Sequence, residues 1–323
     1  MIFIMLRVVF LGTGGALPTV NRNPSSILVN RDGELLLFDC GEGTQHQILR
    51  TKLSLTSLKA IFISHIHGDH CYGLPGLLAS AAMHSRQAPL TIVAPAGVKA
   101  WLEATFEHTQ LWLPFALEFI CSDRLPAVEF EHIAVATARL SHRVPSYAYS
   151  FTEKHSEAVL NVEKLRQKGV PRGPLWGQLK QGMDIEVAGE RLTSDAFLTP
   201  THPPRKIVIA GDNDQPALLR DACQGAQVLV HEATYSQALA QKASEVGHSD
   251  ARRVAAFAES VQLPHLVLTH FSPRYQPGSQ GSPSIEDLRR EAAGAYSGGL
   301  HLPRDLAEYR LDKTGHLAEM TAE

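Results

Sequence analysis

The stretch SHIHGDH at residues 64–70 decides how this chain is interpreted, because it places four strong metal-binding side chains within six positions. It directly follows the apolar run AIFI at residues 60–63, and we predict a buried strand over residues 58–64. His65 and His67 lie two residues apart on an extended backbone, so their side chains project to the same side. The two histidines are therefore expected to share one metal ion.

The rest of the stretch predicts a second metal ion beside the first. Gly68 permits a sharp turn, after which Asp69 and His70 open an apolar helical stretch that runs towards Ala81. Imidazole and carboxylate ligands without thiolate favour zinc, with manganese or cobalt as alternatives. A histidine-rich surface turn is the structural alternative, since the chain contains 16 histidines.

Three distant residues offer the further ligands that two ions need. His142, Asp212 and His270 each stand at or just after the end of a predicted strand. These strands cover residues 133–138, 206–210 and 265–269. Side chains at the carboxyl ends of neighbouring strands converge on a shared crevice. A single His or Asp in such a place is more often structural, but four clusters in equivalent places predict one dinuclear centre.

Several further segments narrow the interpretation to a family. They are FLGTGGALPT at 10–19, RN at 22–23, FDCGEGTQ at 38–45, HEAT at 231–234, GHS at 247–249 and THFSPRY at 269–275. With them, nearly the whole chain resembles the metallo-β-lactamase superfamily and, within it, the short form of ribonuclease Z, the endonuclease that removes the 3′ trailer from precursor tRNA. The metal motif alone would indicate only the superfamily, which includes lactamases, glyoxalases and lactonases.

The segment GVPRGPLWGQLKQG at residues 169–182 resembles the tip of the arm with which ribonuclease Z grips tRNA. It contains too many Gly and Pro residues for a helix interior or a central strand, so we expect a projecting loop. Residues 164–182 carry five Lys and Arg and no Asp or Glu, which suits phosphate contact. The candidate substrate-binding residues are Arg166, Lys168, Arg172, Gly173, Pro174 and Lys180. A solvated basic loop without a partner is the alternative.

Composition limits the class of protein without naming its chemistry. The 323 residues are 44% hydrophobic and 20% charged, as expected for one soluble domain with a large core. A net charge of −3 excludes a protein coated with positive charge, so RNA binding must use local patches. The cysteines, including Cys71 beside the metal motif, have no paired spacing, which favours reduced thiols in a cytoplasm. We expect Cys71 to be a packing residue and not a ligand.

The N-terminal residues 1–11 are apolar but lack a cationic leader and a cleavage site, so we expect a first strand there. The sequence leaves open whether Met1 or Met5 is the natural start. No apolar stretch reaches the length of a membrane span, so no membrane partner is expected. Residues 272–284, rich in Gly, Ser and Pro, are expected to form a mobile loop beside the last ligand.

Alternation of strands with helical stretches predicts an α/β fold. The expected helices cover residues 45–53, 73–85, 98–106, 216–223 and 250–260. The GTGG sequence at 12–15 follows a strand, but its glycine spacing is wrong for dinucleotide binding and Pro18 leads towards another strand. The resemblance implies a four-layer αβ/βα sandwich of the metallo-β-lactamase type, a single domain over residues 1–323 with a tRNA-binding arm inserted at about 155–198.

The resemblance also implies a role for each site residue. One zinc ion is held by His65, His67 and His142, the other by Asp69, His70 and His270, with Asp212 bridging both. Asp69 would also serve as the general base. His248 would contact phosphate or protonate the leaving 3′ oxygen, and Glu232 would orient it. Asp39 is expected to support the ligand loops, and His231 to be structural.

One departure from the family is Asn213, where a threonine usually follows the bridging aspartate; this puts a supporting hydrogen bond in doubt, not the ligand. A homodimer is implied by the resemblance alone. Two other functions stay open: a hydrolase of small phosphodiesters, sulfate esters or thioesters on the same scaffold, and a metal-free RNA-binding relative. The sequence does not decide the cleavage position, any exonuclease activity or the metal used in the cell.

Overall fold

The computed structural model describes residues 5–124, 127–154, 156, 158–276 and 283–320. The chain divides into two compact units, which are described separately. The first comprises Met1–Thr152 and Lys206–Glu323, and the second comprises Glu153–Arg205. The predicted insertion at about 155–198 lies inside the second unit.

In the described part of the first unit, one sheet has eight strands. Their order is β19 (Leu317–Glu319), β18 (Glu308–Leu311), β1 (Leu6–Gly12), β2 (Ser26–Arg31), β3 (Glu34–Phe38), β4 (Leu58–Phe62), β5 (Leu90–Ala94) and β6 (Leu117–Cys121). The turn between β2 and β3 is two residues long, with φ of 49° at Asp32 and 93° at Gly33, the geometry that fits the twist of a hairpin. From β3 to β6 the strands are parallel, because helices connect them.

The second sheet of this unit has seven described strands. Their order is β17 (Gly299–His301), β16 (His265–Thr269), β15 (Val228–Glu232), β14 (Lys206–Ala210), β9 (Ser146–Glu153), β8 (Ile133–Leu140) and β7 (Ala127–Glu129). The strands from β14 to β17 are parallel, so β14, β15 and β16 end at the same edge of the sheet.

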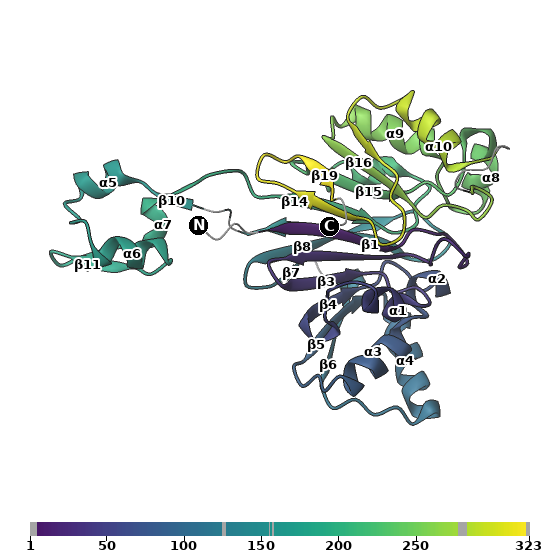
Figure 1. Cartoon of the computed structure of the whole chain (residues 1–323), viewed down its shortest axis with the longest axis horizontal. Coiled ribbons are helices and arrows are strands. Elements are labelled where there is room, and N and C mark those ends of the chain that lie inside the picture. Colours follow the sequence, from purple (N-terminus) through teal and green to yellow (C-terminus); the bar gives the residue numbers. More distant parts are fainter. Residues whose placement is uncertain (1–4, 125–126, 155, 157, 277–282, 321–323) are drawn as a thin grey trace. The chain divides into compact units, whose positions relative to one another are not determined.

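The two sheets pack face to face, and helices cover their outer faces (Figure 1). Side chains along β4 explain the continuous apolar run: Ala60 and Phe62 belong to the core between the sheets, whereas Ile61 packs under the helices. The helices on that side include α1 (Thr44–Leu49), α3 (Leu74–Met83) and α4 (Ala96–Thr109). On the other sheet they include α9 (Ala251–Ser260) and α10 (Ile285–Ala293). The predicted αβ/βα sandwich is therefore confirmed for this unit.

Most predicted elements of the first unit are present, with shifted ends. The strands expected at 206–210 and 265–269 are β14 and β16, but β4 stops at Phe62, two residues before its expected end. The prediction of a helix over residues 216–223 was wrong. Only a single 3₁₀ turn forms, at Pro216–Leu219. Turns follow it up to Gly225, whose φ is 68°. Part of the loop expected to be mobile, residues 277–282, lies outside the described residues. Among the described residues, no helix combines the length and the apolar character that crossing a membrane requires.

The second unit has a small core of its own. It contains α5 (Val162–Gln167), α6 (Pro174–Lys180), α7 (Ser194–Phe197) and two strand pairs, β10 (Ala158–Leu160) with β13 (Leu198–Pro200) and β11 (Ile185–Val187) with β12 (Glu190–Leu192). The buried hydrophobic residues of this core are Leu165, Val170, Leu179, Ile185, Leu192 and Phe197.

The prediction of a loop over residues 169–182 was wrong, because the helix α6 occupies half of this segment. Pro174 stands in the first turn of the helix, where its missing N–H costs no hydrogen bond. Gly177 disfavours a helix by about 1 kcal/mol relative to alanine. Burial of Leu179, with Leu175 and Trp176 packed around the same core, offsets that cost.

A substitution between the sheets tests their packing. Phe62 stacks on Phe38 with ring centroids 5.0 Å apart and lies 5.2 Å from the ring of Tyr149 on the other sheet. Phe62→Ala should lower the free energy of unfolding by about 3–5 kcal/mol, measured by urea denaturation followed by circular dichroism. Leu49→Ala, at a side chain 67% exposed, is the control and should change it by less than about 0.5 kcal/mol. A loss below about 1 kcal/mol for Phe62→Ala would contradict this packing.

Candidate metal centre

All seven residues predicted as metal ligands lie together at one end of the two sheets. The loop after β4 carries His65 and His67, and the short helix α2 (Gly68–Cys71) carries the next two ligands. From the second sheet, His142 follows β8, Asp212 follows β14 and His270 follows β16. The centre therefore forms only where the carboxyl ends of strands from both sheets meet.

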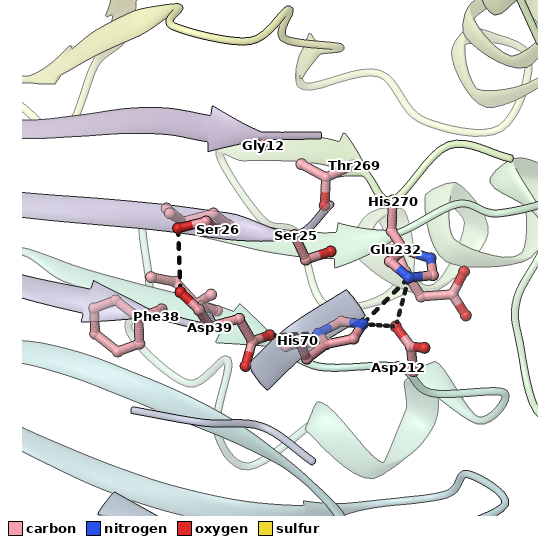
Figure 2. Close-up of a pocket in the computed structure, with 13 residues that line it drawn as sticks. Gly12, Ser25, Ser26, Phe38, Asp39, His70, Asp212, Glu232, Thr269 and His270 are labelled. Carbon is pink, nitrogen blue, oxygen red and sulfur yellow. Dashed lines mark hydrogen bonds and ion pairs between the residues drawn. The ribbon is translucent and has the colours of Figure 1, made fainter. Parts of the chain in front are cut away.

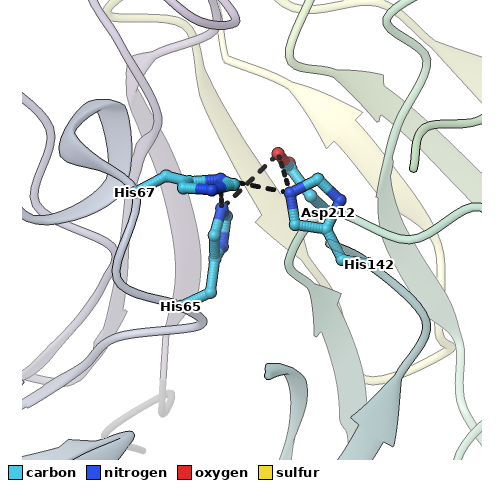
Figure 3. Close-up of side chains that lie close together, drawn as sticks. All are labelled: His65, His67, His142 and Asp212. Carbon is cyan, nitrogen blue, oxygen red and sulfur yellow. Dashed lines mark hydrogen bonds and ion pairs between the residues drawn. The ribbon is translucent and has the colours of Figure 1, made fainter. Parts of the chain in front are cut away.

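The first cluster joins three histidines and one carboxylate (Figure 3). His67 Nδ1 lies 3.1 Å from His65 Nε2 and 3.1 Å from His142 Nε2. Asp212 Oδ2 lies 3.6 Å from His65 Nε2 and 3.7 Å from His142 Nε2. Four ligand atoms thus face one point, as a tetrahedral site requires.

The second cluster consists of Asp69, His70 and His270. His70 Nε2 is 3.2 Å from His270 Nε2, and Asp69 Oδ2 is 3.5 Å and 3.1 Å from these two nitrogens. Asp212 Oδ1 lies 3.4 Å from each nitrogen, and Figure 2 shows His70, His270 and Asp212 pointing toward one another. The two oxygens of Asp212 therefore face different clusters, the arrangement of a bridging ligand.

Hydrogen bonds fix the orientation of four imidazoles by holding each Nδ1. His70 Nδ1 donates to Asp39 Oδ2 at 2.7 Å, and His142 Nδ1 donates to the carbonyl of Gly247 at 2.6 Å. The other two Nδ1 atoms donate to hydroxyl groups that themselves donate to carboxylates. His65 contacts Ser64 Oγ at 2.9 Å, and His270 contacts Thr234 Oγ1 at 2.8 Å. Since each Nδ1 carries its proton outward, each Nε2 presents a lone pair to the centre.

These lone pairs make the donor set fit divalent cations. The lone pairs of His70 Nε2 and His270 Nε2 repel each other at 3.2 Å, and a cation between them removes that repulsion. Asp212 Oδ1 is buried without a hydrogen-bond partner among the described residues. Although burial opposes it, the nearby imidazoles, His270 first, hold the pKa of Asp212 well below its usual range, so it stays a carboxylate.

Cys71 takes no part in this donor set. Its Sγ donates to the carbonyl of Ile66 at 3.4 Å, and burial raises the pKa of the thiol to about 12. The expectation that Cys71 is a packing residue is confirmed.

His248 and Glu232 stand beside the clusters. His248 Nδ1 lies 3.4 Å from Glu232 Oε1 and 3.7 Å from Asp212 Oδ2. Burial lowers the pKa of His248, but Asp212 and Glu232 outweigh it and raise the pKa to about 9. Glu232 also accepts hydrogen bonds from the backbone N–H groups of Thr234 and Ser249, at 2.9 Å and 2.5 Å, which holds the carboxylate in place.

Asn213, at the position where the family usually has threonine, joins the loop of Asp212 to two neighbouring segments. Its Oδ1 accepts from the N–H of Ser141, next to a ligand, and its Nδ2 donates to His231 Nε2 at 3.1 Å. His231 is fully buried, and its Nδ1 donates to the carbonyl of Glu232 at 2.7 Å. His231 is therefore a structural residue, as expected, that links the strand of Glu232 to the loop of Asp212.

Sequence reasoning missed the hydroxyl relays and the backbone groups of the centre. Ser64 and Thr234 sit inside the quoted motifs, but their roles depend on partners 25 and 36 residues away. The N–H of Ala16 donates to Asp69 Oδ2 at 2.8 Å, which no pattern in the sequence indicates. Gly15 is required because a Cβ there would lie 2.6 Å from the His270 ring.

The predicted substrate-binding residues all lie in the second unit. Lys168 Nζ is paired with Glu190 at 2.6 Å, and the Arg172 guanidinium lies 5.3 Å from the ring centroid of Trp176. Lys180 is exposed at the end of α6. The remaining three have local roles: Gly173 (φ 146°) and Pro174 begin α6, and Arg166 lies 4.0 Å from Glu163.

A substitution at Asp39 tests the support of the centre. The two oxygens of Asp39 accept from Ser64 N, Ser64 Oγ and His70 Nδ1 at 2.7–2.9 Å. Asp39→Asn turns an amide N–H₂ toward one of these donors, so the affinity of the centre for a divalent metal ion should fall about 10- to 100-fold, measured by chelator competition. Asp221→Asn, at an exposed carboxylate, is the control. Unchanged affinity in Asp39→Asn would rule out this support.

Comparisons with known proteins bear on the fold and the family. A family model described as "Anti-Pycsar protein Apyc1" matches residues 6–155. A ribonuclease Z of Pseudomonas putida (strain W619) is 46% identical over 319 residues, which cover 98% of this chain and 99% of that protein. A ribonuclease Z of Marinobacter nauticus is 46% identical over 316 residues, covering 95% and 97%.

Among solved structures, the short form of human tRNase Z superposes with a TM-score of 0.65 at 28% identity, covering 94% of this chain and 98% of that one. The metallo-β-lactamase fold protein YhfI from Bacillus subtilis also gives 0.65, at 17% identity, covering 95% and 99%. Similarity at that identity shows the fold alone, and it agrees with the predicted metallo-β-lactamase-like sandwich.

Proposed function

Because the chain belongs to the ribonuclease Z family, we propose that it is a metal-dependent endoribonuclease that removes the 3′ trailer of precursor tRNA and leaves a 3′-hydroxyl on the tRNA. The observation that carries this proposal is the convergence of seven ligand side chains from both sheets on two points that share Asp212. Phosphodiester hydrolysis by paired cations requires such a shared centre. We further propose that the enzyme is a cytoplasmic homodimer.

Two zinc ions per subunit fit the donor set, with manganese or cobalt as alternatives. We assign His65, His67 and His142 to one ion, Asp69, His70 and His270 to the other, and Asp212 to both. When bound, the pair supplies Lewis-acid stabilisation of the phosphodiester and a water molecule of near-neutral pKa. Although burial opposes it, His70 and His270 keep the pKa of Asp69 below its usual range, so this carboxylate is ionised. We assign to it the role of general base towards the attacking water.

His248 is placed to act as the general acid. Its Nδ1 faces the Glu232 carboxylate, and no described residue forms a hydrogen bond with its Nε2. That nitrogen is therefore available to donate a proton to the leaving 3′ oxygen, while Glu232 holds the ring in place. This role makes Glu232 a positioning residue.

Removing the shared carboxylate should disable both ion sites. Asp212→Ala should lower metal content and activity together, because two neighbouring cations then repel each other without an intervening charge. Atomic emission analysis of the purified protein and cleavage of a precursor tRNA with end-mapping measure the two effects. Two bound equivalents of metal with normal turnover would exclude the bridging role.

His248→Ala should keep its metal and slow the chemical step by about 10²- to 10⁴-fold. A phosphodiester with a good leaving group, such as bis-p-nitrophenyl phosphate, needs little protonation and should be affected far less. Equal losses on good and poor leaving groups would leave His248 as a phosphate contact and not an acid.

We propose that the insertion at about 155–198 is the tRNA-binding arm, with contacts through Arg166, Lys168, Arg172, Gly173, Pro174 and Lys180. The ion pair of Lys168 with Glu190 makes Arg172 and Lys180 the more available cations.

Neutralising the available cations tests the arm. Arg172→Gln and Lys180→Gln should each flatten the log–log salt dependence of tRNA binding by about one unit, while hydrolysis of the small phosphodiester stays unchanged. Arg191→Gln is the matched control, because Arg191 is already paired with Asp184 at 2.9 Å. An unchanged salt slope in both variants would instead favour a hydrolase of small phosphodiesters.

A further inference from the structure

Two exposed apolar side chains and one partly buried aromatic ring lie beside the metal-binding loop. Ile66 stands between the ligands His65 and His67, and Tyr72 follows α2; their side chains are 37% and 62% exposed. The ring of Tyr72 lies 5.9 Å from the partly buried ring of Trp101 on α4, at an interplanar angle of 36°. We name Ile66, Tyr72 and Trp101 the aromatic ledge.

The ledge is held against the loop by close approaches at two glycines. A Cβ at Gly68 would lie 2.2 Å from the Tyr72 ring, so only glycine allows the ring to rest there. A Cβ at Gly97, in the first turn of α4, would lie 2.8 Å from Ile66 Cδ1. The ledge is therefore fixed to the backbone that presents His67 and Asp69.

Burial does not account for the ledge. Single exposed apolar residues are ordinary, but an exposed ring that packs on a second aromatic ring next to a reactive centre is a candidate binding surface. The Tyr72 hydroxyl forms no hydrogen bond with any residue that the structure describes. The ring packs beside Trp101 and Gly68 but is 62% exposed, so it still offers a flat apolar surface to solvent.

We infer that the aromatic ledge stacks an unpaired base of the RNA next to the scissile phosphate. This inference rests on the proposed function. The phosphodiester must reach the metal ligands, and Tyr72 directly follows the helix that carries Asp69 and His70, so its exposed ring lies beside the path of a flanking nucleotide. Nucleotides at a cleavage site beyond a paired stem are single-stranded, and aromatic side chains stack such bases with little dependence on sequence.

The test combines a protein variant with a substrate variant. Precursor tRNAs carry an abasic nucleotide at one position at a time, over three positions on each side of the cut. Tyr72→Ala should raise KM for unmodified precursor tRNA about 5- to 150-fold and leave kcat within a few-fold. Tyr72→Phe should match the original protein, because stacking needs the ring and not the hydroxyl.

At one abasic position, the KM of the original protein should rise as much as Tyr72→Ala raises it for unmodified precursor tRNA. The KM of Tyr72→Ala should not rise further with that abasic substrate. Such non-additivity identifies a direct contact. Trp112→Ala is the control: Trp112 is 77% exposed but follows the far end of α4, about 20 Å along the helix from Gly97. Unchanged hydrolysis of bis-p-nitrophenyl phosphate shows that each variant is folded and loaded.

The outcomes separate the two levels of inference. If the original protein does not cleave precursor tRNA, the proposed function fails. If it does, but losses from Tyr72→Ala and the abasic positions simply add, the ledge is not a base-binding site. A change of oligomeric state in Tyr72→Ala without such coupling would show that a second copy of the chain covers the ledge, and would overturn the inference.

Discussion

The metal centre depends on the Asp212 carboxylate, the group that faces both clusters. Its Oδ2 faces His65 and His142, and its Oδ1 faces His70 and His270 at 3.4 Å. The other six ligand side chains gather in two buried clusters on either side of this carboxylate. Their close approach would be energetically unfavourable without its charge between them. The inter-sheet core serves this arrangement, because it fixes the distance between loops that belong to different sheets.

Much of the first unit follows from sequence because strands and ligands share one periodic pattern. Apolar runs give β4, β14 and β16 within two residues of their ends, and His65, Asp212 and His270 follow these runs closely. The strand expected over residues 1–11 is β1, which begins only at Leu6. The positions of His142, Asp212 and His270 relative to the central motif depend on contacts across the chain. Their places at strand ends predicted that they would converge, whereas only the resemblance to a family indicated which ion each would hold.

The errors have local physical causes. Residues 169–182 were expected to form a projecting loop because Gly and Pro were weighed as helix breakers, yet Pro174 occupies a helix start and Leu179 adds core contacts. Likewise, hydroxyl relays through Ser64 and Thr234 depend on partners distant in sequence, and side-chain chemistry alone does not indicate them. Propensity describes a residue's preference, whereas tertiary packing decides whether the preference prevails.

The outward-facing Nδ1 protons have a consequence for the stability of the whole sandwich. Because the four anchored imidazoles are held as ligands before any cation arrives, a bound ion joins loops of the first sheet to loops of the second. An ion that binds only the folded state shifts the folding equilibrium by mass action, in proportion to the logarithm of its free concentration. Bound ions would then cross-link the two sheets. Chelation should therefore destabilise first the edge of the sandwich where the strand ends meet.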